Sequence, residues 1–344
     1  MPEPEQHVVE TSDLRRQLGW LDAVAIYVGI ILGSGIFVAP AAVAAAVGTW
    51  WMAVGLWITG AVIAACGACC YAECGARLPR TGGFYVYYRE AYGEPVAFIG
   101  GWAALLITYP ASLAAIALIF GRYLAEILPY ASDGWIKCYG AAALLLAALL
   151  NGVGVKAGAG MQRVLTTFKV LALALLCLAA LVAPESATVE AATPAASDLL
   201  PTGFGAVLMA MVILLWTYDG WSDVTLVSGE LKTPGRDLGR TVLVGTLLLA
   251  ALYVLVQVAV MFLLSPADAA SSKRVVADAV AGGLGERYGR VVALLVVVST
   301  FGSLNGIVLT ASRLGFAMAR DGVFMRWFGV STRASAHRLA RSAC

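Results

Sequence analysis

The chain has 344 residues, of which 60% are hydrophobic and only 13% are charged, and its mean hydropathy is +0.84. A soluble domain usually carries about 25% charged residues, so this composition excludes an ordinary soluble protein and indicates a polytopic membrane protein. The formal net charge of +2 is far from the basic footprint of a nucleic-acid-binding protein, and we expect no nucleic-acid partner.

Eight stretches are long and apolar enough to cross a lipid bilayer, since about 20 residues span its hydrocarbon core. They cover residues 21–46, 50–72, 95–128, 135–153, 160–183, 204–229, 241–264 and 288–318. The first 20 residues are polar and lack the apolar core of a signal peptide. We therefore expect a cytoplasmic tail at 1–20, a transmembrane domain at 21–318 and a cytoplasmic, atypical tail at 319–344.

Lysine and arginine indicate the orientation, because cytoplasmic loops carry an excess of both. With the N-terminus in the cytoplasm, most basic residues fall on the cytoplasmic side, from Arg15 and Arg16 to Arg313 and Arg320. The loop at 184–203 then lies outside, and it contains acidic residues but no basic one. The sequence thus predicts a multi-pass protein of the cell membrane with a cytoplasmic N-terminus.

Two of the apolar stretches are interrupted near their middle. The first is broken by Gly-Ser-Gly at 33–35, and the sixth by Tyr-Asp-Gly-Trp at 218–221. A broken helix exposes backbone N–H and C=O groups that hydrocarbon cannot satisfy. Glycine in one such helix is explained as well by close helix packing. Paired breaks in two halves of a chain instead point to a substrate site at the bilayer midplane, and we favour that interpretation.

The two breaks offer opposite partial charges. The helix that restarts around Ser34 and Gly35 presents free N–H donors and a positive dipole end, which suit a carboxylate. The carbonyl groups from Trp216 to Asp219 present acceptors and a negative dipole end, which suit an ammonium group. A ligand with both groups on one carbon is an α-amino acid. We therefore hypothesise an amino acid substrate that is held with few charged side chains.

An ionisable side chain, Lys169, lies at the same depth as the breaks. It is about ten residues into the fifth stretch, which places it about 15 Å deep and near the midplane. Burying such a group costs about 2.5 to 3.5 kcal/mol on insertion scales. One interpretation is an ammonium group that is neutralised or held by backbone carbonyls. The other is a fixed or titrating positive charge that acts beside the broken first helix.

Other chemistries find little support in the sequence. Cys66, Cys69, Cys70 and Cys74 share one face of the second stretch at a spacing that a soft metal ion could use. Small residues surround them, and close packing of membrane helices selects small residues, so we expect neither a metal nor another cofactor. Zinc-protease, serine–histidine and phosphate-loop motifs are missing from the sequence, which argues against an enzyme or a nucleotide-driven pump.

A family resemblance covers about residues 14–330. It is carried, in order, by LDAVAIYVGIILGSGIFVAP, YAECGARLPRTGGFYVYYREAYG, WTYDGWSDVTLVSGELKTPGRDLGRT and NGIVLTASRLGFAMARDGVF. These segments resemble the amino acid-polyamine-organocation permeases, and within them the L-type amino acid transporter branch and its bacterial relatives. The resemblance implies an all-α inverted-repeat fold of five plus five helices with helices one and six broken. It also implies secondary active transport of amino acids by alternating access.

The resemblance assigns roles to residues at both breaks. Ser34 and Gly35 match backbone amides that bind the substrate carboxylate. Ile31, Trp216 and Asp219 match residues whose carbonyls receive the amino group, and Trp216 also matches an aromatic gate. The complete set of predicted substrate-binding residues is Ile31, Gly33, Ser34, Gly35, Trp216, Tyr218, Asp219 and Gly220.

The resemblance also bears on coupling and substrate. Lys169 matches a fifth-helix lysine that replaces a sodium site, which implies sodium-independent exchange or proton-linked uptake. The second transported species is then a counter-transported amino acid or a proton. Small neutral amino acids are the expected substrates, because Asp219 and Asp223 are the only intramembrane acids that could pair a cationic side chain, and Asp223 is expected to cap the outgoing half-helix.

The sequence departs from the family near its end. The family has ten core helices and usually twelve in all, whereas eight apolar stretches occur here. The closing residues, GVSTRASAHRLARSAC, are polar and basic and unlike a loop into a ninth span. We expect from this a truncated second repeat that lacks its last two core helices. The alternative function is then a non-transporting permease remnant or a membrane partner protein.

Overall fold

The structure is a computed structural model that describes residues 14–47, 49–182, 203–272, 274–285 and 287–329. Within these ranges every regular element is helical. Six helices are long and apolar enough to cross a membrane, and two shorter apolar helices accompany them. The eight predicted stretches are therefore all present, six as long helices and two as the predicted broken ones.

The long helices have the following bounds. They are α3 (Trp50–Arg77), the continuous run of α5 (Glu94–Ala103), η2 (Ala104–Thr108) and α6 (Tyr109–Ile127), α7 (Asp133–Gly152), α8 (Val155–Val182), α10 (Pro234–Leu263) and α13 (Arg287–Arg320). Proline in the first turn starts α5 and α10, where the missing N–H leaves no hydrogen bond unmade at the helix start. Short helices lie outside the spans: α4 (Phe84–Tyr92), α11 (Pro266–Ser271), α12 (Val275–Leu284) and η4 (Arg326–Gly329).

Both predicted interruptions are confirmed. The first span consists of α1 (Trp20–Ile31), a short 3-10 turn η1 (Gly35–Phe37) and α2 (Ala39–Val47). The sixth consists of α9 (Phe204–Thr217), a non-helical turn and the 3-10 segment η3 (Asp223–Glu230). Gly220 is needed at the second break, because its φ of 109° is unfavourable for other residues and an added Cβ would lie 2.8 Å from Ile30 Cγ2.

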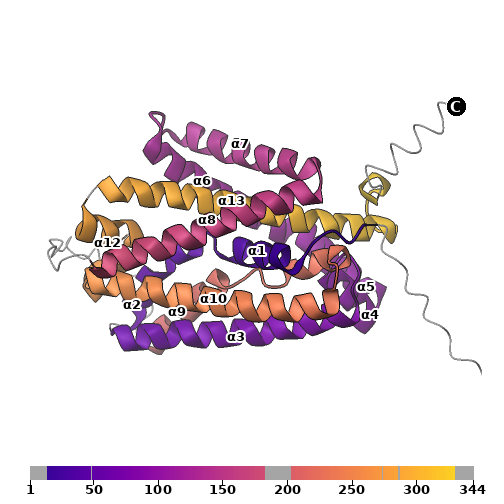
Figure 1. The fold of residues 1–344 in the computed structure, drawn as a ribbon, viewed down its shortest axis with the longest axis horizontal. Helices are drawn as coiled ribbons and strands as arrows, with labels where there is room; N and C mark the ends of the chain where they lie inside the picture. The colour runs from indigo at the N-terminus through magenta and orange to yellow at the C-terminus, as the bar shows by residue number, and fades with distance from the viewer. Residues whose placement is uncertain (1–13, 48, 183–202, 273, 286, 330–344) are drawn as a thin grey trace, which may run out of the picture.

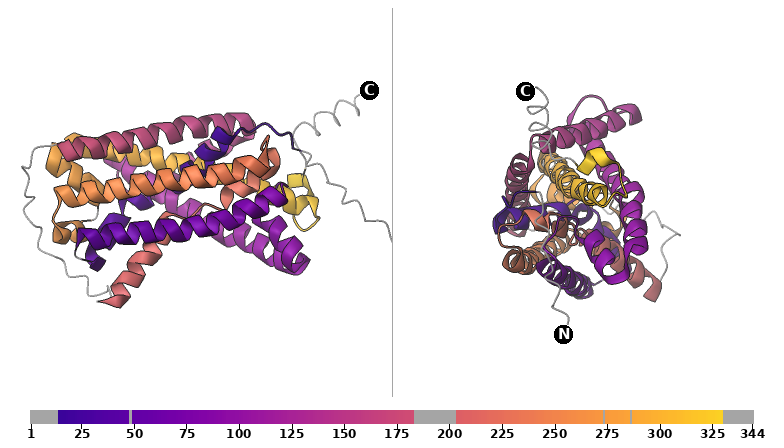
Figure 2. Two further views of the ribbon diagram at one scale, coloured as in Figure 1. Left: turned by 60° about the horizontal axis from the view of Figure 1, so that its bottom comes forward. Right: turned by 90° about the vertical axis from the view of Figure 1, so that its right-hand side faces the viewer.

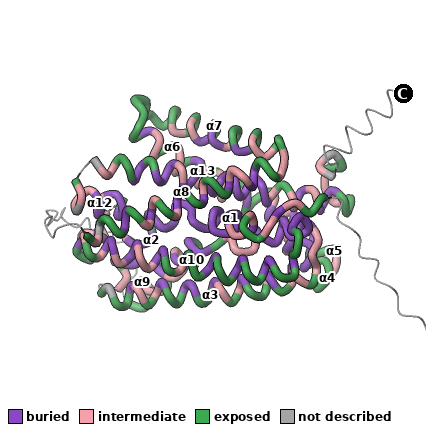
Figure 3. Tube along the Cα trace, in the orientation of Figure 1, coloured by how far each residue is buried: buried purple, intermediate pink, exposed green. Residues whose placement is uncertain are grey.

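The helices surround the first broken one. α3 and α10 run side by side along one edge of the molecule, α6 and α7 lie along the other, and α1 lies between them (Figure 1). α1 is largely buried in the centre, whereas the outer helices alternate between buried and exposed residues (Figure 3). The left view of Figure 2 shows α9, in salmon, extending away from the bundle. α4 and α5 lie at one end, called the α4 end, and α2 and α12 at the opposite end.

Small residues bring two helices close together between α6 and α7, but not on the outer face of α3. A Cβ on Gly140 of α7 would lie 2.6 Å from the carbonyl oxygen of Ala117 of α6, so this pair of helices packs backbone against backbone. The clustered cysteines of the second span do not contribute to such a contact. Cys66, Cys69 and Cys70 are free thiols that are exposed on the outer face of α3. Their small neighbours do not pack another described helix against that face.

Candidate functional site

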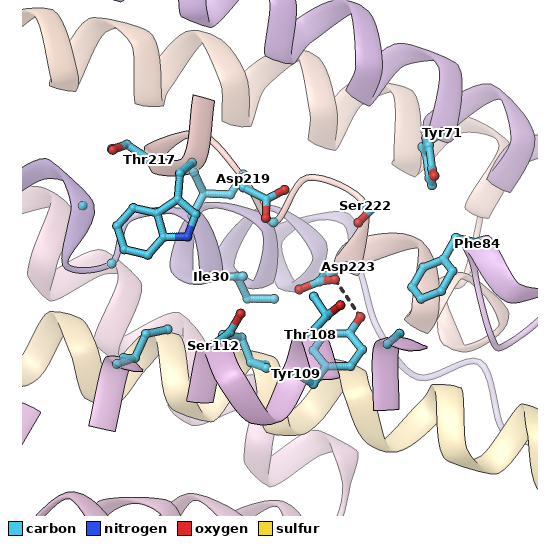
Figure 4. A pocket seen from close by; sticks show the side chains of 18 of the residues that line it. Ile30, Tyr71, Phe84, Thr108, Tyr109, Ser112, Thr217, Asp219, Ser222 and Asp223 are labelled. Atoms are coloured by element: carbon cyan, nitrogen blue, oxygen red, sulfur yellow. Dashed lines mark hydrogen bonds between the residues drawn. The ribbon is translucent and has the colours of Figure 1, made fainter. Parts of the chain in front are cut away.

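A cavity of about 390 Å³ lies between the two breaks (Figure 4). Its walls come from the two broken helices, that is from α1 with η1 and from α9 with η3. Further walls come from α4 and from the third span, which is the continuous run of α5, η2 and α6. Seven of the eight predicted substrate-binding residues line it, namely Ile31, Gly33, Ser34, Gly35, Trp216, Asp219 and Gly220. The volume is in the range of sites for small molecules, about 300 to 1,000 Å³.

The first break supplies unpaired donors. In the described part of the chain, the backbone N–H groups of Ser34 and Gly35 donate to no other protein group. Gly35 also lies against the second broken helix, because an added Cβ would be 2.8 Å from Thr217 Oγ1 and 3.0 Å from its Cγ2. The lack of a side chain at Gly35 therefore allows the two breaks to approach each other and leaves its amide accessible from the cavity.

The second break supplies acceptors, although not all of the predicted ones are free. The carbonyl oxygen of Trp216 accepts a hydrogen bond from the Asp219 N–H at 3.2 Å, and that of Ile31 accepts one from the Gly33 N–H at 2.7 Å. Among the described residues, the carbonyl oxygens of Tyr218 and Asp219 accept no hydrogen bond. Of the three carbonyls that the resemblance assigned to the amino group, only that of Asp219 is therefore without a partner among the described residues.

The side chain of Tyr218 lies behind the wall of the cavity. It is buried and packs edge-on against Trp57, with ring centroids 5.9 Å apart, and at a tilt against Tyr253, with centroids 4.9 Å apart. Its hydroxyl donates to the carbonyl oxygen of Trp57 at 3.3 Å. Of the eight predicted residues, Tyr218 is therefore the one that the structure does not bring to the cavity, and its ring anchors the break to α3 and α10.

Lys169 lies beside the first break and outside the cavity wall. Its side chain is 1% exposed, and Nζ donates to the carbonyl oxygens of Gly29 and Leu32 at 2.6 Å each and of Ser299 at 3.3 Å. It forms no ion pair with a carboxylate in the part of the chain that the structure describes. The geometry matches the interpretation in which backbone carbonyls hold the ammonium group. The hydroxyl groups of Ser299 and Ser303 donate to the same carbonyl oxygens, those of Leu32 and Gly29 respectively. α8 and α13 therefore cover the carbonyl end of α1 together.

The sequence reasoning missed the wall that comes from the third span. The Tyr109 hydroxyl donates to Asp223 Oδ1 at 2.9 Å, and Asp223 is 8% exposed. Asp223 was expected to cap the outgoing half-helix, but it is the first residue of η3, and its carboxylate instead accepts the hydrogen bond from Tyr109. Thr108, Tyr109 and Ser112 all reach the cavity (Figure 4).

A π-helical turn, η2, gives the third span this geometry. It covers Ala104–Thr108 and ends two residues before Pro110. Proline inside a helix lacks an N–H and its ring clashes with the carbonyl four residues earlier, so the preceding turn widens. Such turns are frequent at functional sites. Pro110 within an apolar stretch was thus a signal in the sequence that could have indicated this wall.

Contacts at the α4 end tie both broken helices together. Arg313 of α13 pairs with Glu230 at the end of η3, with Nε 2.7 Å from Oε1, and Glu230 is 2% exposed. The backbone N–H of Leu18 donates to the Glu230 carbonyl at 3.0 Å, and the N–H of Lys232 donates to the Leu18 carbonyl at 3.0 Å. The segment before α1 and the segment after η3 therefore form a short parallel bridge, between Leu18 and Leu231.

A family model described as amino acid permease matches residues 18–338. The chain belongs to the amino acid permease family. The permease is 33% identical over 311 residues to the serine/threonine exchanger SteT of Bacillus subtilis, which covers 90% of the permease and 69% of SteT. It is 31% identical over 327 residues to the mouse b(0,+)-type amino acid transporter 1, covering 92% and 66% of the two chains. It is 34% identical over 318 residues to the rabbit large neutral amino acids transporter small subunit 2, covering 90% and 58%. The permease thus spans between 58% and 69% of the length of these relatives.

Solved structures support the fold. The permease superposes on Mhp1, a nucleobase-cation-symport-1 family transporter solved in a closed conformation with bromovinylhydantoin bound, with a TM-score of 0.59 and 14% identity. The match covers 96% of the permease and 74% of Mhp1. The permease is therefore a multi-pass membrane protein with the inverted-repeat transporter fold. Its described residues supply the five elements of the first repeat and the first three of the second.

Proposed function

We propose that the permease binds an α-amino acid between its two breaks and carries it across the membrane by alternating access. The observation behind this proposal is the pairing of unused backbone groups at one cavity. Ser34 and Gly35 offer N–H donors at the first break, and Asp219 offers a carbonyl acceptor at the second. Donors and acceptors of this kind complement a carboxylate and an ammonium group on one small molecule. The names of the relatives, which are exchangers and transporters of amino acids, support the same substrate class.

We further propose that transport does not depend on sodium. In transporters of this fold, unwound carbonyls at the broken helices coordinate the coupling cation. Here the Lys169 ammonium group already contacts the carbonyls of Gly29 and Leu32. A sodium ion at this position would have to displace a covalently attached positive charge. Amino acid exchange is the coupling that we favour, with proton-linked uptake as the alternative.

The proposed location is the cell membrane with the N-terminus in the cytoplasm. The α4 end, which carries Arg77, Arg80 and Arg89, is then cytoplasmic, in agreement with the rule that basic residues concentrate there. In this orientation the bridge between Leu18 and Leu231 closes the cytoplasmic ends of both broken helices.

Transport and binding are tested separately. Uptake of labelled amino acids is measured in proteoliposomes that contain the purified chain and are either empty or preloaded with unlabelled amino acid. Uptake that requires preloading supports exchange, whereas uptake that follows an imposed proton gradient and ignores preloading supports proton-linked transport. Binding without uptake by monodisperse protein would support the alternative of a permease that keeps its site and does not cycle. The lack of saturable binding of any amino acid would contradict the proposal.

A further inference from the structure

The cavity has an unbalanced charge. Asp219 and Asp223 both line it, and no lysine, arginine or histidine is found among the described residues of its wall. Asp219 is accessible from the cavity, and Asp223 is nearly buried. In Figure 4 the two carboxylates lie in the middle of the cavity, between the broken end of α9 and the ring of Phe84. The buried ammonium group of Lys169 contacts carbonyl groups instead, and Lys169 is not part of the wall.

Carboxylates in a membrane-embedded cavity need partners. An ionisable residue within a span usually faces a partner of opposite charge or a transported species. The only described partner of the Asp223 side chain is the Tyr109 hydroxyl, 2.9 Å from Oδ1, which satisfies one oxygen and supplies no charge. Asp223 therefore has a fixed orientation toward the cavity and lacks a countercharge from the protein.

We propose that Asp223 binds a second cationic group of the substrate, so that this permease selects amino acids with a positively charged side chain. The inference rests on the proposed function, because it deepens the substrate class of the same site. The α-carboxylate binds at the amides of Ser34 and Gly35, and the α-ammonium group binds at the break beside Asp219. The side chain then extends along the cavity to Asp223, which Tyr109 positions.

The part of the cavity beyond Asp223 fits the stem of such a side chain. Phe84, Tyr71 and Tyr88 line the cavity at its α4 end, and Figure 4 shows Phe84 and Tyr71 beyond Asp223. Aromatic rings accommodate methylene groups and attract a cation over their faces. A small neutral amino acid would leave this region unfilled and the Asp223 carboxylate without a countercharge. The inference thus favours substrates with a cationic side chain, whereas the sequence-based prediction favoured small neutral amino acids.

The test compares two ligands whose side chains have the same four carbons. L-lysine and L-norleucine have side chains of similar shape, and they differ in the terminal ammonium group that Asp223 would bind. Binding of each labelled ligand is measured on the purified chain and on Asp223→Asn, which keeps an acceptor for Tyr109 and removes the charge. Glu73→Gln, at an exposed position of α3 paired with Arg77, is the control for the loss of one carboxylate. Size-exclusion profiles establish that all variants are folded.

We expect lysine to bind more tightly than norleucine to the unaltered chain and to the Glu73→Gln control. Asp223→Asn should weaken lysine binding about tenfold or more, the usual effect of losing a hydrogen bond to a charged group, and should change norleucine binding by less than about threefold. Tyr109→Phe should weaken lysine binding in the same direction by a smaller factor, because the carboxylate remains.

Two results would overturn the inference while leaving the proposed function standing. One is tighter binding of norleucine than of lysine by the unaltered chain. The other is an equal change of both affinities in Asp223→Asn, which would make the carboxylate structural. Failure of the folded chain to bind either ligand, or any other amino acid, would instead contradict the proposed function itself.

Discussion

The hydroxyl oxygen of Tyr253 lies 3.0 Å from the carbonyl oxygen of Ile31, the last residue of α1. The same hydroxyl lies 3.2 Å from the carbonyl oxygen of Thr217, the last residue of α9. One side chain of α10 therefore contacts the carbonyl ends of both broken helices. Because a hydroxyl has a single proton, the two carbonyls share one donor. A small displacement of either helix would leave the donor with the other, which couples the positions of the two breaks.

Removal of this hydroxyl should loosen both breaks. We expect Tyr253→Phe to lower the stability of the purified permease by about 1 to 3 kcal/mol, because a buried carbonyl loses its donor while the ring still fills its place. Amino acid binding should weaken at the same time. Thermal unfolding in detergent and ligand binding measure both effects. Tyr139→Phe is the control, since the Tyr139 hydroxyl donates to a backbone carbonyl at an exposed position. Equal effects of both variants would contradict a special role for Tyr253.

Gly35 should not tolerate a methyl group. A Cβ at this position would lie 2.8 to 3.1 Å from three atoms of Thr217, so Gly35→Ala must push the two breaks apart. We expect about a 5- to 150-fold loss of amino acid affinity, by analogy with the cost of overpacking a close contact, about 1 to 3 kcal/mol. Binding measurements on Gly35→Ala and on Gly55→Ala test this, because no atom lies within 4 Å of a Cβ at Gly55.

A second-site change should partly reverse that loss. Combining Gly35→Ala with Thr217→Ala removes the hydroxyl and methyl groups that the new Cβ would meet, and leaves the Thr217 Cβ position at 3.1 Å. We expect the double variant to bind more tightly than Gly35→Ala alone. If the double variant is no better, the loss has another cause, such as a requirement for glycine flexibility in the break itself.

Most of the fold could be predicted from the sequence, because the sequence signals for membrane spans and for helix breaks are local. Apolar stretches of sufficient length specify spans, and glycine beside polar residues at 33–35 and 218–221 specifies where two of them break. The direction of the Tyr218 side chain was not predictable, because the helical periodicity that relates a residue to a face ends at the break. The pairing of Tyr109 with Asp223 was also missed, because residues 114 positions apart meet only through the packing of the third span against η3.

Lys169 should exclude sodium from the first break. In Lys169→Ala, the carbonyls of Gly29, Leu32 and Ser299 lose their common donor, and oxygen atoms in this arrangement suit a small cation. We expect the variant to unfold at a lower temperature than the unaltered permease. Replacing choline chloride with sodium chloride should then stabilise the variant and leave the unaltered permease unchanged.

A matched control is available on the same helix. Lys156 is exposed near the start of α8, so Lys156→Ala also removes one positive charge and should show neither effect. Thermal unfolding of the three proteins in the two salts provides the measurement. Stabilisation of the unaltered permease by sodium would contradict the proposed sodium independence.

The Arg313–Glu230 ion pair should contribute far more to the stability of the folded permease than a surface ion pair does. Glu230 is 2% exposed, so Arg313→Met leaves a buried carboxylate without its partner, which typically costs about 3 to 5 kcal/mol. Arg77→Met breaks the exposed pair with Glu73, and we expect a change of less than about 1 kcal/mol. Replacing both Arg313 and Glu230 with methionine should recover much of the stability that Arg313→Met loses. Unfolding transitions of the three variants test this, and a small effect of Arg313→Met would show that the pair is hydrated.

The π turn at Ala104–Thr108 divides the third span into two helices with different rotational phase. Its wider turn holds about one residue more than an α-helical turn, and one residue corresponds to about 100° of rotation in an α-helix. Without that residue, the span would shorten by only about 1.5 Å and would still cross the bilayer. Every side chain of α6, however, would face a new direction, and Tyr109 would no longer point at Asp223. On this side of the cavity, the number of residues in the π turn therefore determines which side chains contact the substrate.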